Sequence, residues 1–482
     1  MPASHPDILW IYCDELRTDA LGCYGNPRFR PRTPRMDGLA EGGVRFANNF
    51  CNSPVCVSSR MCVLTGLYPE DTGVYNNEAA WKNFRLPHRP DTFPQVFARN
   101  GYQTANFGKV HVARGMYPGE NPECEIFGFH NRASGEMNFW KPLTEEELRM
   151  IRPPTRGGMN GGIWPEGVPY PPEKVVDNAL AWMAEAASPY LVRVSLLQPH
   201  TPVLPPARFV RMYEEMDVGL PGPLPETLSA FERRVAEVHG LEAMAPEMLR
   251  EARRHYYALV AWIDTQVGRV LDFLQESGRL DRTIVIFGAD HGNPIGDTGA
   301  FEKHTFTPSV HRVPLIVNWP GGLPDGEVRG DICDSLDISR TLFALAGIDV
   351  PEQFKGRNLF GDPEPEAIYS TIGYGQPDSR LAPNSGAGQW YGNRGWPRRS
   401  CIRTRQFRLD RNMRLDGKPP CPEDEDVFLA DVIAAPQETV NLAARPAYAS
   451  IVRDLSDRLL EHARGAVEVP PECLVRAQRK QT

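Results

Sequence analysis

The chain has 482 residues, of which 41% are hydrophobic and 24% are charged, and its 53 Lys and Arg against 61 Asp and Glu give a formal net charge of −8. This balance is typical of a globular protein and argues against a nucleic-acid-binding protein held by its net charge. Because no apolar run reaches the roughly 18 residues of a membrane span, and because the first residues carry acidic groups rather than a secretory signal, we expect a cytoplasmic protein without membrane partners.

Short apolar runs rich in β-branched residues recur at positions 8–12, 190–197, 283–287 and 313–317. Continuous apolar runs of this length predict strands that are buried on both faces. Between the second and third runs, apolar residues over 256–274 recur at steps of three and four and predict a helix that ends near Gly278. The alternation favours an α/β fold, with a large, mostly parallel sheet sandwiched by helices.

The pattern changes after about residue 365, where the apolar segments become brief and an amphipathic helix is predicted over 447–464. We therefore expect a catalytic domain over 1–365 and a smaller C-terminal α+β domain over 366–482. Two stretches rich in Gly, Pro and aromatic residues, 152–173 and 373–397, are interpreted as ordered loops at the rim of a site or at the domain junction.

Two pairs of metal-ligating residues directly follow predicted strands. Asp14 and Glu15 come after the first strand, and Asp290 and His291 come after the third. Ligands of open α/β sheets bind at the carboxyl ends of the strands, so the two pairs can meet there around a cation. The carboxylates suit Mg²⁺ or Ca²⁺, and the imidazole extends the choice to Mn²⁺, Fe²⁺ or Zn²⁺. The structural alternatives are a solvated acidic loop and a histidine that caps a turn.

A candidate nucleophile stands at the start of a short predicted helix. Cys56 opens a segment that runs to Leu64 and ends at Thr65-Gly66, and Arg60 projects from the same face one turn later. A helix N-terminus favours an anion, so a nucleophile and a cation placed there suit sulfuryl or phosphoryl transfer. A packed structural cysteine is the simpler alternative.

Further basic residues and histidines stand in otherwise apolar surroundings, namely Lys109, His111, His200, Lys303 and His304. Each could be an ordinary surface residue. Together they would supply charge stabilisation and acid–base groups for the cleavage of an ester.

Taken in order, these motifs resemble the formylglycine-dependent sulfatases of the alkaline phosphatase superfamily, which include phosphonate monoester hydrolases and phosphodiesterases. The resemblance extends from residue 8 to about residue 320. It rests on the acidic pair at 14–15, the signature CVSSRMCVLTG at 56–66, KVH at 109–111, QPHTP at 198–202, DHG at 290–292, Lys303 and RVPL at 312–315.

The resemblance implies that a formylglycine-generating enzyme oxidises Cys56 and that the hydrated aldehyde attacks sulfur or phosphorus. The implied ligands of one divalent ion, Ca²⁺ or Mn²⁺, are Asp14, Glu15, Asp290 and His291. The implied catalytic residues are Cys56, Arg60, Lys109, His111, His200 and Lys303, with His200 assisting the leaving oxygen and His111 accepting a proton from the second hydroxyl. Asn77 and His304 are implied substrate contacts.

The chain departs from the family pattern at two positions. Ser58 replaces the signature proline that the modifying enzyme reads, and Glu15 stands where aspartate is usual. If Cys56 is not converted, it would be a thiol of lowered pKa beside a cation and a helix N-terminus. His291 is more typical of the phosphodiesterase and phosphonate branch.

We therefore expect a metal-dependent hydrolase of a small organic sulfate ester. A phosphonate monoester hydrolase or phosphodiesterase is the first alternative, and a non-catalytic oxyanion-binding relative is the second. Aromatic residues of the two loops, Trp164, Trp390, Tyr391 and Trp396, could enclose the leaving alcohol. A homo-oligomer is compatible with the sequence.

Overall fold

The computed structural model describes residues 5–80, 86–113, 130–131, 161–221, 227–239, 244–373, 397–414, 419–420, 422 and 425–467. Of the two aromatic loops, residues 161–173 are included, whereas Trp390, Tyr391 and Trp396 lie outside the described residues. No helix in these ranges is long and apolar enough to cross a membrane.

A sheet of eight strands forms the centre of the larger unit, in the order β4-β3-β5-β1-β6-β7-β2-β8. Its strands are β1 (Asp7–Asp14), β2 (Val44–Phe50), β3 (Gln103–Gly108), β4 (His130–Asn131), β5 (Tyr190–Pro199), β6 (Thr283–Ala289), β7 (Leu315–Asn318) and β8 (Glu327–Asp334). Only β7 among them runs antiparallel to its neighbours. The four predicted strands are all present, and the expected mixed, mostly parallel sheet is confirmed.

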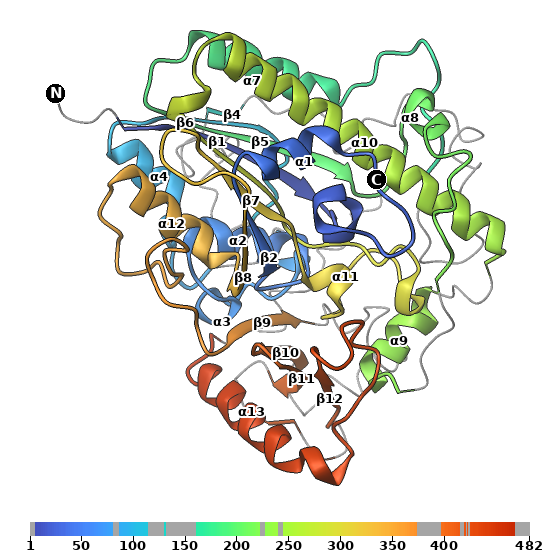
Figure 1. The fold of residues 1–482 in the computed structure, drawn as a ribbon. Coiled ribbons are helices and arrows are strands. Elements are labelled where there is room, and N and C mark those ends of the chain that lie inside the picture. The colour runs from blue at the N-terminus through green and yellow to red at the C-terminus, as the bar shows by residue number, and fades with distance from the viewer. Residues whose placement is uncertain are drawn as a thin grey trace, which may run out of the picture.

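Helices cover both faces of this sheet (Figure 1). One face packs under α1 (Pro34–Glu41), α7 (Glu173–Glu185) and α10 (Pro246–Glu276), and the other under α2 (Cys56–Thr65), α4 (Phe93–Arg99) and α12 (Leu336–Ala346). The central strand β1 alternates between them, since Leu9 and Ile11 join the first core while Trp10 and Tyr12 join the second. The predicted helix over 256–274 is the C-terminal part of α10, and Gly278 follows its end with φ 65°.

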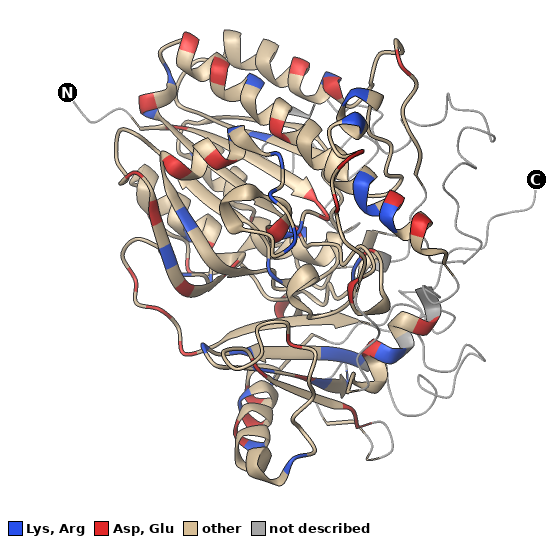
Figure 2. Ribbon diagram, turned by 45° about the vertical axis from the view of Figure 1, so that its right-hand side comes forward, with Lys and Arg blue, Asp and Glu red and all other residues tan. Residues whose placement is uncertain are grey.

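Shorter helices lie in the connections: α3 (Pro69–Thr72), α8 (Ala207–Arg211), α9 (Ala230–His239) and α11 (Pro308–His311). Figure 2 shows acidic and basic residues interspersed along the outer helices, whereas the central strands β1 and β6 carry no charge between their end residues. This distribution follows from burial of the sheet on both faces.

The C-terminal part forms a separate antiparallel sheet in the order β12-β11-β10-β9, at the bottom of Figure 1. Its strands are β9 (Ile368–Gly373), β10 (Pro397–Arg403), β11 (Phe407–Arg414) and β12 (Val427–Asp431), and α13 (Ala449–His462) packs against them. Leu455 and Leu459 of α13 share a core with Ile402 and Leu409 of the sheet. A smaller α+β unit was expected here and is confirmed; a boundary at residue 365 stays a prediction.

A buried carboxylate of α10 caps the N-terminus of α1. Asp264 Oδ1 accepts hydrogen bonds from the backbone N–H groups of Arg35 (2.9 Å) and Met36 (2.8 Å), which have no partner inside their own helix. We predict that Asp264→Ala lowers the free energy of unfolding by about 2 kcal/mol, because both donors lose a charged acceptor. Urea denaturation checks this, with Gln275→Ala, an exposed position on the same helix, as the control.

Candidate active site

The two predicted ligand pairs meet because β1 and β6 are adjacent parallel strands. Cys13 pairs with Ala289 in the register of these strands, so the residues that follow them emerge side by side. The Glu15 backbone N–H donates to Asp290 Oδ1 at 3.2 Å. Asp14, Glu15, Asp290 and His291 are completely buried. The neighbouring strands add Lys109 after β3 and His200 after β5, so one edge of the sheet supplies most of the site.

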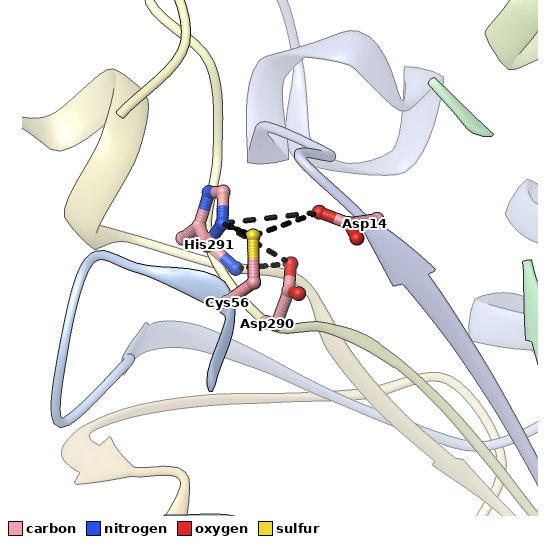
Figure 3. A group of neighbouring side chains, drawn as sticks. All are labelled: Asp14, Cys56, Asp290 and His291. Carbon is pink, nitrogen blue, oxygen red and sulfur yellow. Dashed lines mark hydrogen bonds and ion pairs between the residues drawn. The ribbon is translucent and has the colours of Figure 1, made fainter. Parts of the chain in front are cut away.

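Cys56 is the first residue of α2 and lies against these ligands (Figure 3). Its Sγ is 3.2 Å from His291 Nε2 and 3.6 Å from Asp14 Oδ1. The helix ends as predicted, with Gly66 in the left-handed conformation at φ 66°. The short helix therefore aims its N-terminal amides and Cys56 at the edge of the sheet where the acidic pairs lie.

The donor atoms of the cluster suit a divalent cation. His291 Nε2 faces Asp14 Oδ1 at 3.8 Å and Asp290 Oδ1 at 3.7 Å, which is too long for hydrogen bonds. The other ring nitrogen, Nδ1, lies 3.0 Å from the Gly292 carbonyl, an arrangement that leaves Nε2 free to ligate. Asp14, Cys56, Asp290 and His291 together offer ligand atoms within 4.8 Å of one another. The residues present thus fit the divalent cation that the sequence motifs predict.

Three cationic side chains surround the acidic groups. Lys109 Nζ contacts Asp14 Oδ2, and Lys303 Nζ is 2.6 Å from Glu15 Oε1. Lys109 follows Gly108, which has φ 90°. A Cβ atom added at residue 108 would lie 2.0 Å from the Ser195 carbonyl oxygen. Residue 108 must therefore be glycine for β3 to end with Lys109 at the site.

Arg60 occupies a different position from the two lysines. Its Nε donates to Asp290 Oδ2 at 2.9 Å and its Nη2 to Asp14 Oδ2 at 3.3 Å, and the side chain is completely buried. Its Nη1 donates to Ser195 Oγ at 3.0 Å. Arg60 therefore pairs with one carboxylate of each acidic pair. The charges that act most strongly on the Cys56 thiol are those of Lys109 and Lys303.

The two histidines flank Cys56. His200 Nε2 lies 3.3 Å from Lys303 Nζ and 3.4 Å from Glu15 Oε1, and His200 is partly exposed. Burial and the charge of Lys109 lower the pKa of His111, although its hydrogen bond with Cys56 opposes this shift. For His200, burial opposes protonation, but the carboxylate of Glu15 raises its pKa above the ordinary value. The surroundings thus favour the neutral form of His111 and the protonated form of His200.

The electrostatics of the cluster differ from one ligand to the next, since burial and the charge of Asp14 raise the pKa of Asp290. Burial opposes the charge of Asp14, yet Lys109, His200 and Arg60 hold its pKa below the usual range. Burial likewise opposes a Cys56 thiolate, but Lys109 and Lys303 bring the thiol pKa well below its ordinary value. For His291, the charge of Asp290 outweighs burial and raises the pKa to about 9, so a cation that binds to Nε2 must displace a proton from the ring.

Two residues that the sequence did not point to hold the Glu15 turn. Glu15 has φ 64°, in the left-handed region that disfavours side chains. Tyr256 of α10 donates its hydroxyl proton to the Glu15 carbonyl oxygen at 2.6 Å and accepts from the Arg17 backbone N–H at 3.1 Å. Asn293 Nδ2 donates to Glu15 Oε2 at 2.9 Å. Both act through Glu15.

We predict that Tyr256→Phe weakens divalent-metal binding about tenfold, because the turn that positions Glu15 loses both hydrogen bonds. Metal titration of the purified protein measures this effect. Tyr257→Phe, the neighbouring buried tyrosine whose ring packs on Phe29, is the matched control and should bind metal as the unmodified protein does.

The remaining predicted residues lie at the start of α2. Asn77 Oδ1 accepts from the Val57 backbone N–H at 3.0 Å, so this side chain caps the helix that carries Cys56. The His304 backbone N–H donates to the Pro54 carbonyl oxygen at 3.1 Å, which ties the segment after Lys303 to the same helix start. Ser58 Oγ donates to the Val74 carbonyl oxygen at 2.5 Å. Contacts of Asn77 and His304 with a substrate stay predictions.

Comparison with known proteins identifies the family. A family model described as Sulfatase matches residues 6–348. The chain is 28% identical to an arylsulfatase of Clostridium perfringens over 391 residues, which is 73% of this chain and 77% of that protein. It is 29% identical to the human iduronate 2-sulfatase over 403 residues, or 72% and 70% of the two chains. The chain belongs to the sulfatase family, within the alkaline phosphatase superfamily, and is an enzyme of the sulfuric ester hydrolase class.

A solved structure shows the same fold. The phosphonate monoester hydrolase SpPMH from Silicibacter pomeroyi superimposes with a TM-score of 0.75 at 23% identity, covering 95% of each chain. The likeness confirms the alkaline phosphatase-like architecture with its smaller C-terminal unit.

Proposed function

We propose that this enzyme hydrolyses a small organic sulfate ester with residue 56, as formylglycine, as the nucleophile. The observation that carries the proposal is the position of Cys56 Sγ, 3.2 Å from His291 Nε2 and 3.6 Å from Asp14 Oδ1 at the N-terminus of α2. A nucleophilic oxygen at the position of Sγ would lie beside the metal ligands and two lysines. The positive charges and the helix N-terminus would stabilise an oxyanion there.

The ligands proposed for the divalent ion, Ca²⁺ or Mn²⁺, are Asp14, Glu15, Asp290 and His291. Asp14, Asp290 and His291 share one cluster with Cys56, and Glu15 shares a second cluster with Asp14 and His200. When bound, the ion would supply Lewis-acid stabilisation of charge on the transferred group. Lys109 and Lys303 would bind the non-bridging oxygens of the sulfate ester. Arg60 is proposed as a positioning residue, since its donors already face Asp14 and Asp290.

Protons at the site are assigned to the two histidines. As the bond between sulfur and the alcohol oxygen breaks, His200 would give a proton to the departing oxygen, and its contact with Glu15 favours the protonated form that this step needs. His111, whose burial favours the neutral form, would accept the proton of the second hydroxyl of residue 56 as sulfate leaves. The restored aldehyde is then ready for hydration and another turnover.

Ser58 is proposed to be compatible with conversion of Cys56 by a formylglycine-generating enzyme. The residue is the third of α2, where a backbone N–H needs no helical acceptor and a proline would also fit. Its hydroxyl reaches the Val74 carbonyl oxygen, a contact a proline would not make. The serine therefore replaces the conformational restraint of proline by a hydrogen bond and leaves the start of the helix in place.

A phosphorus ester is the second candidate substrate, favoured by the imidazole of His291 among the ligands, which is typical of the phosphonate and diesterase branch. The test is a panel of 4-nitrophenyl sulfate, 4-nitrophenyl phenylphosphonate and bis(4-nitrophenyl) phosphate at one metal loading. Because the esters differ in charge at the transferred group, their kcat/KM values separate the candidates. The proposal expects the sulfate to have the highest value. A higher value for either phosphorus ester contradicts the proposal, and so does the absence of product from all three esters.

A further inference from the structure

A second cavity, of about 490 Å³, lies apart from the residues assigned to catalysis and metal binding. It is bounded by the segment after β1 (residues 17–28), the first half of α10, the start of α11 and residues 436–439. None of the proposed catalytic or metal-binding residues lines it. Its volume falls in the range of about 300–1,000 Å³ that is usual for small-molecule sites.

The charges along this cavity are unequal. Four arginines line it (Arg17, Arg28, Arg253 and Arg312), against two aspartates (Asp19 and Asp297). Both aspartates pair with Arg17, the second at 2.8 Å, and Arg253 is 3.3 Å from Asp297. Each carboxylate of the cavity therefore already forms an ion pair, and neither pairs with Arg28 or Arg312.

Arg312 has no carboxylate partner among the described residues. Its Nε donates to the neutral Thr18 Oγ1 at 3.2 Å. The nearby Glu438 pairs with Arg403 at 2.7 Å and with Arg408 at 3.1 Å instead. Burial lowers the pKa of the Arg312 guanidinium although the charges of Asp19 and Glu438 oppose this shift, so the surroundings compensate this cation only in part. Such a group is stabilised when an anion binds to it.

Neutral hydrogen-bond donors lie around the same space. Thr18, Thr307 and Ser309 line the cavity, whereas the hydroxyl of Thr298, which also lines it, already donates to the Asp297 carbonyl oxygen at 2.6 Å. A guanidinium can bind two oxygens of a sulfate or phosphate group, and hydroxyl groups can donate hydrogen bonds to the other oxygens. The cavity is also much larger than a single inorganic ion, so it has room for the organic part of a molecule.

From these observations we propose that the cavity is a second binding site, for a small organic molecule that carries an oxyanionic group, with Arg312 as its anchor. The site is distinct from the one that holds Cys56. Arg28, exposed at the rim with its guanidinium on the Leu220 carbonyl, adds a second positive charge to the entrance.

The test is calorimetric titration of the metal-loaded Cys56→Ala protein, in which turnover is blocked, with glucose 6-sulfate, inorganic sulfate and glucose at constant ionic strength. The proposal expects two classes of site for glucose 6-sulfate, of which Arg312→Gln weakens one about tenfold or more. Glucose should not bind there, and inorganic sulfate should bind more weakly than the sugar sulfate. An unchanged titration in Arg312→Gln, or equal affinity for inorganic sulfate, overturns the proposal.

Two further variants distinguish a loss of binding from a loss of folding in Arg312→Gln. Arg312→Lys keeps the charge but not the planar pair of donors, so an intermediate loss is expected. Arg30→Gln is the matched control, since Arg30 is 82% exposed, lies two residues from Arg28 and does not line the cavity; it should leave the titration unchanged. Because binding is measured without turnover, the result is independent of whether the enzyme hydrolyses sulfate esters.

Discussion

Replacing Cys56 by alanine is expected to lower kcat by about 10⁵-fold, because no other side chain among the described residues can place a nucleophilic atom at the same point. The Cys56 Sγ position combines the N-terminus of α2, the contact with His291 and the approach of Lys109. Asp14, Glu15, Asp290 and His291 stay in place, so the variant should still bind a divalent metal, without any contribution from the side chain of residue 56. Steady-state kinetics with the preferred ester and metal analysis measure the two effects.

The matched control is Cys62→Ala. Cys62 lies in the same helix and is equally buried, but burial and the charge of Glu70 raise its pKa, as expected of an inert structural thiol. This variant should retain kcat within a few-fold. Equal losses in both variants would mean that the helix, rather than the nucleophile, had been disturbed, and full activity of Cys56→Ala would refute the assigned role.

The second large effect is expected for Asp290→Asn, with at least a 100-fold loss of metal affinity and about a 10³-fold fall in kcat. Asp290 faces His291 Nε2 at 3.7 Å, accepts from the Glu15 backbone N–H and pairs with Arg60 at 2.9 Å. The amide keeps the shape but removes the charge on which the cation and Arg60 depend. Metal content after dialysis and kcat at saturating metal separate the two losses.

Asp7→Asn serves as the control, because Asp7 is a buried aspartate at the opposite end of β1. It should alter stability without altering metal content. If Asp290→Asn bound metal as tightly as the unmodified protein, the ion would have to be held elsewhere, and the ligand set of Asp14, Glu15, Asp290 and His291 would be wrong.

Much of the site could be predicted because it depends on local rules. Asp14 and Asp290 each follow a continuous apolar run, and the carboxyl ends of parallel strands gather at one edge of a sheet. The start of α2 at Cys56 followed from a short helical segment ended by Gly66. These features require only a strand, a turn and a helix N-terminus, and the sequence marks each of them.

Other features depend on contacts between distant segments. Tyr256 is one apolar position among many in α10, and nothing in its spacing indicates that its hydroxyl holds the turn at Glu15, 241 residues away. Arg60 was expected to stabilise developing charge, and its contacts with Asp14 and Asp290 could not be read from the sequence; its catalytic role stays a prediction. Likewise, the antiparallel direction of β7 depends on how the chain returns to the sheet, which an apolar run does not encode.

The most direct test of the account is the mass of the tryptic peptide that carries residue 56, from protein made in its native host and treated with an alkylating reagent. If residue 56 is formylglycine, the peptide resists alkylation, has the mass of an aldehyde in place of the thiol and reacts with a carbonyl reagent. A fully alkylated Cys56 peptide from active enzyme would contradict the formylglycine mechanism.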